Sequence, residues 1–138
     1  MERVRKGFTL IEILIVVAII ALLASLVAPR LFGKLESSKQ KIAKTQINLI
    51  ETALDMFRLD VGRYPTTQEG LKVLWSNPGD IPNWHGPYLK KPIEKDPWGH
   101  PYIYRCPGKH GAYDLYSLGA DGKPGGTGEN KDITSWDN

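Results

Sequence analysis

The sequence predicts an α+β protein in which a long N-terminal helical stem carries a small head with a short helix and an antiparallel β-sheet. Three observations predict this fold class. Residues 8–28 are almost uniformly apolar, residues 29–62 repeat apolar side chains at helical spacing, and nine of the ten prolines follow residue 63. Proline interrupts helices and central strands, so the last part should consist of short elements and loops. We therefore divide the chain into residues 1–7, 8–28, 29–62 and 63–138.

Residues 8–28 are long enough to cross a membrane as one helix. At about 1.5 Å per residue they span roughly 30 Å, the thickness of the hydrocarbon core of a bilayer. Apolar side chains surround this helix and leave no polar stripe of the kind that a soluble amphipathic helix shows. Glu12 is the exception, because a carboxylate at the centre of a bilayer costs about 2.5 kcal/mol or more. We expect Glu12 to lie near the interface, to be protonated or to be paired.

The seven residues before the apolar run are basic and end in Gly7. The positive-inside rule places such a segment in the cytoplasm and the rest of the chain across the membrane. One alternative is an ordinary secretory signal cleaved near Ala28, where the sequence reads A-S-L-V-A-P. A second alternative is a plain single-pass anchor in which Glu12 extends to the interface.

Residues 29–62 continue the stem as an amphipathic helix. Pro29 removes a backbone hydrogen bond and clashes with the preceding turn, so a kink or local melting is expected there. Gly62 can adopt the left-handed conformation that ends a helix. The predicted buried stripe consists of Ile42, Gln46, Leu49, Ala53, Met56 and Phe57, widened by Ile50, Leu54 and Val61.

The head is predicted to contain one short helix and two paired strands. Thr66 and Glu69 have the spacing of a capping box, which predicts a short helix that reaches about Trp75. A turn signal, DPWG, leads into an expected strand at residues 102–105, and alternating side chains predict a second strand at residues 112–118. Tryptophans and tyrosines should fill the core of so small a head, in preference to forming a platform for carbohydrate or nucleic acid.

Charge, cysteine and histidine content argue against several function classes. The first seven residues carry +2 of the net charge of +3, so the body lacks the basic surface of a nucleic-acid-binding protein. Cys106 is the single cysteine and cannot form an internal disulfide. His85, His100 and His110 lie separately in predicted loops, without a nucleophile–base pair or a metal-binding motif. We predict that the protein is no enzyme and binds no nucleic acid.

The sequence K-G-F-T-L-I-E at residues 6–12 resembles the prepilin processing motif of type IV pilins and pseudopilins. The resemblance implies that a prepilin peptidase cuts after Gly7 and methylates the new N-terminal amine of Phe8. Residues four apart share a helix face, which places the Phe8 amine and the Glu12 carboxylate on one side of the stem. In the family this carboxylate meets the terminal amine of a neighbouring subunit, and the pairing makes both charges tolerable in lipid.

Three further motifs narrow the resemblance: YPTTQEGL at residues 64–71, DPWG at 96–99 and SLGADGKPGGTGENKDITSW at 117–136. Together with the leader and stem they resemble the major pseudopilins of bacterial type II secretion systems over essentially the whole chain. The resemblance implies a single-pass inner-membrane precursor with a cytoplasmic N-terminus and a periplasmic head. Its mature form would polymerise into a homo-oligomeric filament, the pseudopilus, that drives proteins across the outer membrane. The implied partners are minor pseudopilins, the inner-membrane assembly platform and the prepilin peptidase. The alternative is a type IV pilin or competence pseudopilin that acts in adhesion or DNA uptake.

A glycine-rich loop between Asp121 and Asp132 is a candidate cation site. Calcium takes six to eight oxygen ligands at about 2.3–2.6 Å, from carboxylates and backbone carbonyls. The glycines allow the chain to curl so that carbonyls turn inward. The loop is no EF-hand, because Lys123 and Gly125 occupy positions where that motif needs ligands. From the residues alone, a metal site and an ordinary loop both remain open.

The resemblance to major pseudopilins implies that calcium holds this loop. Carried over by position, the ligands are the carbonyls of Leu118 and Lys123 and the carboxylates of Asp121 and Asp132. The sequence departs from some members of the family, which have adjacent acids where this chain has Lys131 before Asp132. The remaining ligand would come from Asn130 or from the carbonyl of Thr127 or Gly128.

Overall fold

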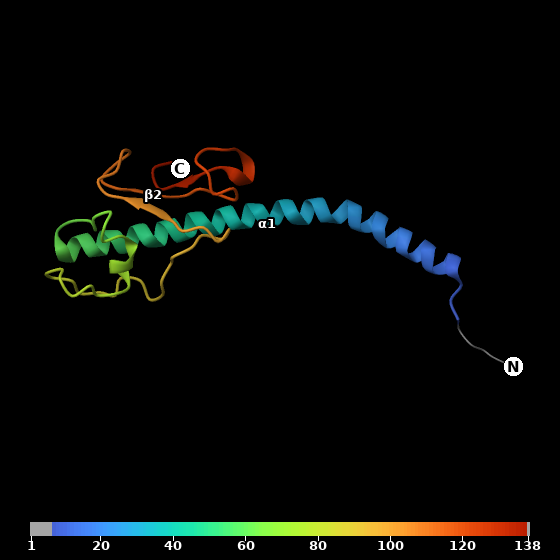
Figure 1. The fold of residues 1–138 in the computed structure, drawn as a ribbon, viewed down its shortest axis with the longest axis horizontal. Helices are drawn as coiled ribbons and strands as arrows, with labels where there is room; N and C mark the ends of the chain where they lie inside the picture. Colours follow the sequence, from blue (N-terminus) through green and yellow to red (C-terminus); the bar gives the residue numbers. More distant parts are fainter. Residues whose placement is uncertain (1–6, 138) are drawn as a thin grey trace. The chain divides into compact units, whose positions relative to one another are not determined.

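The computed structural model describes residues 7–137, apart from the side chain of Phe32. Residues 1–6 of the predicted leader lie outside the described part. The elements in chain order are α1 (Leu10–Val61), η1 (Leu71–Leu74), β1 (Ile103–Arg105), β2 (Asp114–Ser117), η2 (Gly128–Asn130) and β3 (Ile133–Thr134) (Figure 1). This order confirms the α+β class. The chain divides into two compact units, residues 1–36 and residues 37–138.

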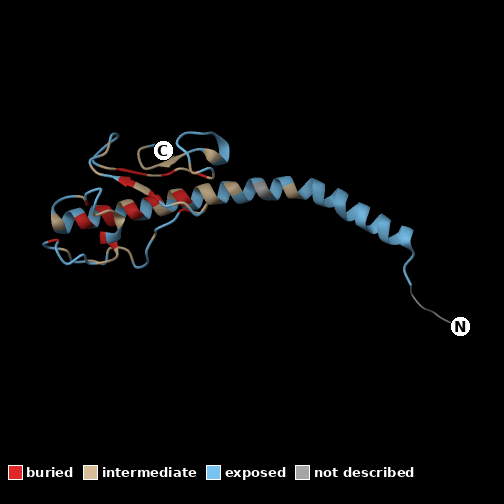
Figure 2. Ribbon diagram, viewed as in Figure 1, coloured by how far each residue is buried: buried red, intermediate tan, exposed pale blue. Residues whose placement is uncertain are grey.

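The first unit contains the apolar half of α1, which begins two residues later than predicted. The Thr9 hydroxyl accepts a hydrogen bond from the backbone N–H of Glu12 at 3.1 Å and thereby caps the helix. The helix continues through Pro29 without a break, so the predicted local melting is absent from the described stem. By length and composition α1 is able to cross a membrane, and its most apolar segment contains no buried residue (Figure 2).

The second unit is built around residues 43–57 of α1. Figure 2 shows that burial along the helix concentrates in this half. The buried helix residues are Ala43, Ile47, Ile50, Ala53, Leu54 and Phe57. All of these except Ala43 form one cluster with Val73, Leu74, Ile81, Tyr102, Tyr104 and Leu115. The head therefore has a core of its own, in which α1 is the central element.

The buried face of α1 confirms part of the predicted stripe, because Ile50, Ala53, Leu54 and Phe57 are buried. Ile42, Leu49 and Met56 were expected inside, yet their exposed fractions are 49%, 52% and 47%. Ala43 and Ile47 are buried but were not predicted, and they lie one position after Ile42 and Gln46. One position turns a side chain by about 100° around a helix, so helical periodicity alone could not fix the edge of the buried face.

The end of α1 confirms the prediction at Gly62. The helix ends at Val61, and Gly62 follows with a φ of 93°. The Gly62 N–H donates to the carbonyl of Arg58 at 2.8 Å, which satisfies one of the last helix carbonyls.

The capping box is formed, but the short helix that follows is smaller than predicted. The Thr66 hydroxyl accepts from the Glu69 N–H at 3.1 Å, and a Glu69 carboxylate oxygen accepts from the Thr66 N–H at 2.8 Å. Gly70 then takes a φ of 68°, which interrupts the helical path. Only the single 3₁₀ turn η1 follows, so the capping box closes a turn in place of starting an α-helix.

The sheet has three antiparallel strands in the order β1-β2-β3. Ile103 pairs with Tyr116 on one side of β2, and Tyr116 pairs with Thr134 on the other. β1 and β2 confirm the two predicted strands, with shorter bounds. β3 was not predicted, because two residues are too few to show an alternating pattern.

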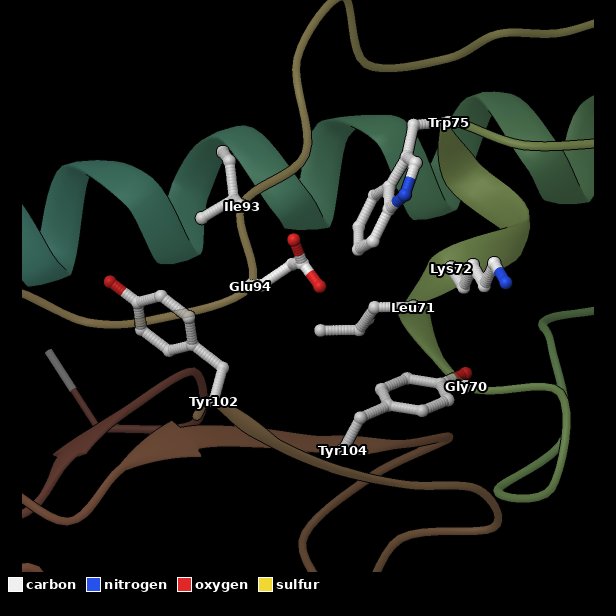
Figure 3. Close-up of a pocket in the computed structure, with 8 residues that line it drawn as sticks. All are labelled: Gly70, Leu71, Lys72, Trp75, Ile93, Glu94, Tyr102 and Tyr104. Atoms are coloured by element: carbon white, nitrogen blue, oxygen red, sulfur yellow. The ribbon is translucent and has the colours of Figure 1, made fainter. Parts of the chain in front are cut away.

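An open cavity of about 400 Å³ lies between η1, residues 93–94 and β1 (Figure 3). The tyrosines that line this cavity make hydrogen bonds within the head. The Tyr104 hydroxyl donates to the carbonyl of Pro65 at 2.6 Å, and the Tyr102 hydroxyl donates to the side chain of Gln46. Burial raises the pKa of both hydroxyls above the ordinary range of tyrosine, so both remain protonated donors. These tyrosines are core residues, as the sequence predicts.

Candidate functional site

The residues of the predicted processing site lie at the exposed start of the stem. Gly7 and Phe8 precede α1, and the Phe8 side chain is exposed. Glu12 lies in the first turn, where the positive end of the helix dipole favours a carboxylate. Because Phe8 lies before the helix in the unprocessed chain, its predicted position on the same face as Glu12 stays a prediction. Thr9, which caps this turn, is a residue that the sequence analysis missed.

The candidate cation loop is folded back on itself. Its first limb, which begins at Gly119, lies against its last limb, which ends at Asp132. The Ala120 N–H donates to the carbonyl of Glu129 at 3.0 Å. Gly119 has a φ of 76°, and a Cβ there would lie 2.7 Å from the Lys131 carbonyl oxygen. A Cβ on Gly126 would likewise lie 2.6 Å from the Asn130 carbonyl oxygen. Glycine is therefore required where the two limbs touch.

The two aspartates of the loop are held in different ways. One Asp121 oxygen accepts from the Lys123 N–H at 3.1 Å, and Asp121 is exposed. Asp132 Oδ2 accepts from the Gly125 N–H at 3.0 Å. Asp132 Oδ1 is buried and has no hydrogen-bond partner among residues 7–137. A buried carboxylate oxygen without a partner is destabilising, and a bound cation would satisfy it.

A calcium ion in this loop would depend on backbone carbonyls as well as carboxylates. Within the described chain no three His, Cys, Asp or Glu side chains gather around one point. Thr127 and Gly128 already accept hydrogen bonds, and Gly128 accepts two: from Gln40 Nε2 at 2.6 Å and from the Lys131 N–H at 3.3 Å. A carbonyl oxygen has two lone pairs, so Gly128 is the least suited of the expected ligands.

The last limb of the loop and residues 134–137 are attached to α1 by Lys44 and Gln40, to which the sequence analysis assigned no role. Lys44 Nζ donates to the carbonyl of Thr134 at 2.7 Å and to that of Asp137 at 3.0 Å. Gln40 Nε2 donates to the Gly128 carbonyl at 2.6 Å. Asp132 and Thr134 line a cavity of about 460 Å³ beside these contacts. The pattern of the sequence gives no signal for such contacts, which join residues about 90 positions apart.

The first limb of the loop rests on a buried carboxylate from the DPWG turn. Asp96 is 5% exposed, and its Oδ1 accepts from the backbone N–H groups of Trp98 and His100 at 3.0 and 2.9 Å. Asp96 Oδ2 accepts from the Ser117 hydroxyl at 2.6 Å. The sequence analysis identified the turn but missed the link to Ser117. An aspartate at the start of such a turn is the signal that could have indicated a capping carboxylate.

Comparison with known proteins identifies the family. A family model described as type II secretion system, protein G, matches residues 30–136. The chain belongs to this family. A second model, the prokaryotic N-terminal methylation motif, matches residues 3–28.

Relatives of protein G cover almost the whole chain. The type II secretion system core protein G of Pseudomonas aeruginosa is 49% identical, over 99% of this chain and 99% of the relative. That of Vibrio cholerae is 45% identical, over 99% and 96%. A crystal structure of the major pseudopilin from the type 2 secretion system of enterohaemorrhagic Escherichia coli superposes with a TM-score of 0.62 at 34% identity, over 78% of this chain and 95% of that one.

These similarities confirm the predicted fold and the resemblance to major pseudopilins. The protein G family is one of structural pseudopilins and is not an enzyme family. The apolar N-terminal helix and the methylation motif together fit a pseudopilin anchored in the inner membrane. None of these similarities tests the calcium ligands, which stay a prediction.

Proposed function

We propose that the chain is the major pseudopilin of a type II secretion system, a structural subunit that polymerises into the periplasmic pseudopilus and drives protein export across the outer membrane. The observation that carries the proposal is the apolar surface of α1. Large apolar side chains from Leu10 to Leu31 are exposed, whereas the head buries a core of its own. A surface of this kind needs lipid or other helices to cover it. The head needs neither.

The proposed precursor crosses the inner membrane once, with a cytoplasmic N-terminus and a periplasmic head. A prepilin peptidase cuts after Gly7 and methylates Phe8, which agrees with the methylation motif at residues 3–28. Further partners are other copies of the chain, minor pseudopilins and the inner-membrane assembly platform. The subunit has no catalytic role and binds no nucleic acid. Adhesion or DNA uptake by a type IV pilin or competence pseudopilin is less well supported, because the matching family is protein G.

Replacing Glu12 with leucine tests assembly separately from membrane insertion. The substitution removes a carboxylate from an apolar segment, so insertion should be unchanged or improved. The pairing partner for a neighbouring N-terminal amine is lost, so filament assembly and secretion should fall to the level of a strain that lacks the protein. Membrane fractionation measures insertion, and the amount of exported protein in the medium measures secretion.

Ser25→Leu is the matched control, because it removes another polar side chain from the same apolar segment. The Ser25 hydroxyl is uncharged and donates to the Leu22 carbonyl within the same helix, so it offers no charge that could pair with a neighbouring N-terminal amine. Secretion should be near normal with Ser25→Leu. Normal secretion with Glu12→Leu would contradict the proposed role of the carboxylate.

We also propose that one calcium ion fastens the C-terminal loop. Asp132 and Asp121 supply carboxylates, and Leu118 and Lys123 supply carbonyls. The partnerless Oδ1 of Asp132 supports this arrangement. Ordering each residue of a loop costs about 1–2 kcal/mol, and this loop buries little apolar surface against that cost. At a calcium concentration 100 times Kd, binding stabilises the fold by about 2.7 kcal/mol.

Thermal unfolding of the detergent-solubilised full chain tests the calcium proposal. For a small domain the expected shift in Tm between calcium and chelator is at least about 10 °C, at about 4–8 °C per kcal/mol. Magnesium should replace calcium poorly, because it demands a tight octahedral site. Asp132→Asn keeps the shape of the side chain and should abolish most of the shift, as should Asp121→Ala.

Glu129→Gln is the control for charge, because it removes an exposed acid from the same loop without removing a proposed ligand. The calcium shift should persist in this variant. Equal Tm values of the wild type in calcium and in chelator would contradict the calcium site.

A further inference from the structure

We propose that Asp96 is a positioning residue for the calcium loop, and that it acts through Ser117 to fix the direction of the Leu118 carbonyl. The inference rests on the proposed calcium site, to which it adds two residues outside the ligand set. Asp96 lies in the DPWG turn, and Ser117 is the last residue of β2. Two segments about twenty positions apart therefore meet where the loop begins.

The Asp96 carboxylate is held rigidly. Oδ1 accepts two backbone N–H groups of its own turn, and the Asp96 N–H donates to the His100 carbonyl at 2.7 Å. Oδ2 is left for the Ser117 hydroxyl, at 2.6 Å. Ser117 has no exposed surface, so its hydroxyl has little freedom to choose another partner. This geometry is that of a charge-assisted hydrogen bond in a buried setting.

The Ser117 hydroxyl links the Asp96 carboxylate to the first peptide of the loop. While its proton is donated to Asp96, its oxygen accepts from the Gly119 N–H at 3.2 Å. The Gly119 N–H and the Leu118 carbonyl belong to one planar peptide group, in which they point in opposite directions. Fixing the N–H toward Ser117 therefore fixes the Leu118 carbonyl to point away from it. Leu118 is the first of the proposed ligands.

The same contacts reach the last limb of the loop. Gly119 lies so close to Lys131 that a Cβ would come within 2.7 Å of its carbonyl oxygen, and Lys131 directly precedes Asp132. A movement of the 118–119 peptide would displace this limb. The Asp96 turn also places His100 beneath the loop, where its Nε2 lies 3.4 Å from the Ala120 carbonyl. The turn thus supports the whole first limb.

Calcium titration of the full chain in detergent tests the proposal. Protein freed of metal by chelator is titrated with calcium in a calorimeter, at a temperature well below the Tm of every variant. Ser117→Ala removes the linking hydroxyl. Asp96→Asn replaces the acceptor with an amide, which leaves the Ser117 proton without its carboxylate. Loss of a partner outside the ligand set typically weakens metal binding about 10–100-fold, and we expect each variant to show a Kd at least about 10-fold higher.

Asp96 and Ser117 act on the loop through the same hydrogen bond. The calcium Kd of the double variant should therefore be no higher than that of the single variant that binds calcium more weakly. Matched controls lie in β2 and directly after β3. The Ser135 hydroxyl also accepts a backbone N–H of β2, that of Leu115 at 3.3 Å, and Asp114 is a second buried carboxylate that accepts backbone N–H groups. Ser135→Ala and Asp114→Asn should lower the Tm in chelator but leave the calcium Kd within about twofold of the wild type. A role in stability alone would lower the Tm of Ser117→Ala in the same way without changing its Kd.

The outcomes separate this inference from the calcium proposal. A wild type that binds no calcium overturns both. A wild type that binds calcium, with Ser117→Ala and Asp96→Asn binding it equally well, overturns the positioning role and leaves the calcium site standing. An increase in Kd as large in Ser135→Ala or Asp114→Asn also overturns it, because the effect would then be general to the head.

Discussion

The side chains of Ile50 and Leu49 are adjacent in sequence, and replacing each with alanine should have very different effects on stability. Ile50 has no exposed surface and belongs to the core cluster of the head. Leu49 is 52% exposed. Both residues belong to the stripe that the sequence predicts, so the pair tests which part of that stripe the head covers.

The expected magnitudes follow from burial. Truncating a buried isoleucine to alanine costs about 2–5 kcal/mol, because apolar contacts are lost and a cavity remains. Complete burial of a leucine side chain is worth about 1.5–3 kcal/mol, and Leu49 keeps about half of its surface in solvent, so its truncation should cost roughly 1 kcal/mol or less. At about 4–8 °C per kcal/mol, Ile50→Ala should lower the Tm by at least about 8 °C.

Urea and thermal unfolding of the full chain in detergent measure the difference, with near-ultraviolet circular dichroism reporting on the aromatic side chains of the head. The calcium concentration is held constant, because a bound ligand shifts apparent stability. Equal destabilisation by Leu49→Ala and Ile50→Ala would refute the assigned face. A larger effect of Leu49→Ala would place the buried face on the other side of the predicted stripe.

Two further predictions concern the N-terminus and acid stability. Intact-mass analysis of the protein extracted from its native membrane should show loss of residues 1–7 and one added methyl group on Phe8; an N-terminus at residue 29 would contradict this. Burial alone would raise the pKa of Asp114, but hydrogen bonds from the backbone N–H groups of residues 109–110 lower it below the ordinary value. A carboxylate with a depressed folded-state pKa stabilises the fold above its unfolded pKa of about 3.9 and loses that contribution as pH falls. The stability difference between wild type and Asp114→Asn should therefore be largest near neutral pH and shrink below about pH 4; a difference that is independent of pH would contradict it.

Local features of the chain were predictable because each has a local cause. The apolar run of residues 8–28, the helix end at Gly62 and the capping box of Thr66 and Glu69 all depend on residues within a few positions of one another. Of the two longer strands, the first follows a local turn signal and the second carries its own alternating pattern. In each case the sequence contains the full physical reason for the element.

The remaining features depend on contacts that no local pattern encodes. The stem has more apolar side chains than the head can cover, so the choice of Ile50 over Leu49 is made by the packing of η1 and the sheet. The candidate cation loop could be located from its glycines and aspartates. Its support could not, because the bond from Ser117 to Asp96 and the bond from Gln40 to Gly128 join residues 21 and 88 positions apart.

The attachment of the C-terminus to Lys44 has a consequence for how the head forms during synthesis. The Lys44 contact with Thr134 joins residues 90 positions apart, and β3, which covers one edge of β2, follows β1 and β2 in the chain. At a translation rate of about 5–20 residues per second, Lys44 leaves the ribosome roughly 5–18 s before its partner is made. The end of β2 at Ser117 is made 16 residues before the start of β3 at Ile133. At the same rate β2 has an open edge for roughly 1–3 s, and through such an edge an unfinished sheet can pair with foreign strands. The nascent head is thus most vulnerable to aggregation between the synthesis of β2 and that of β3.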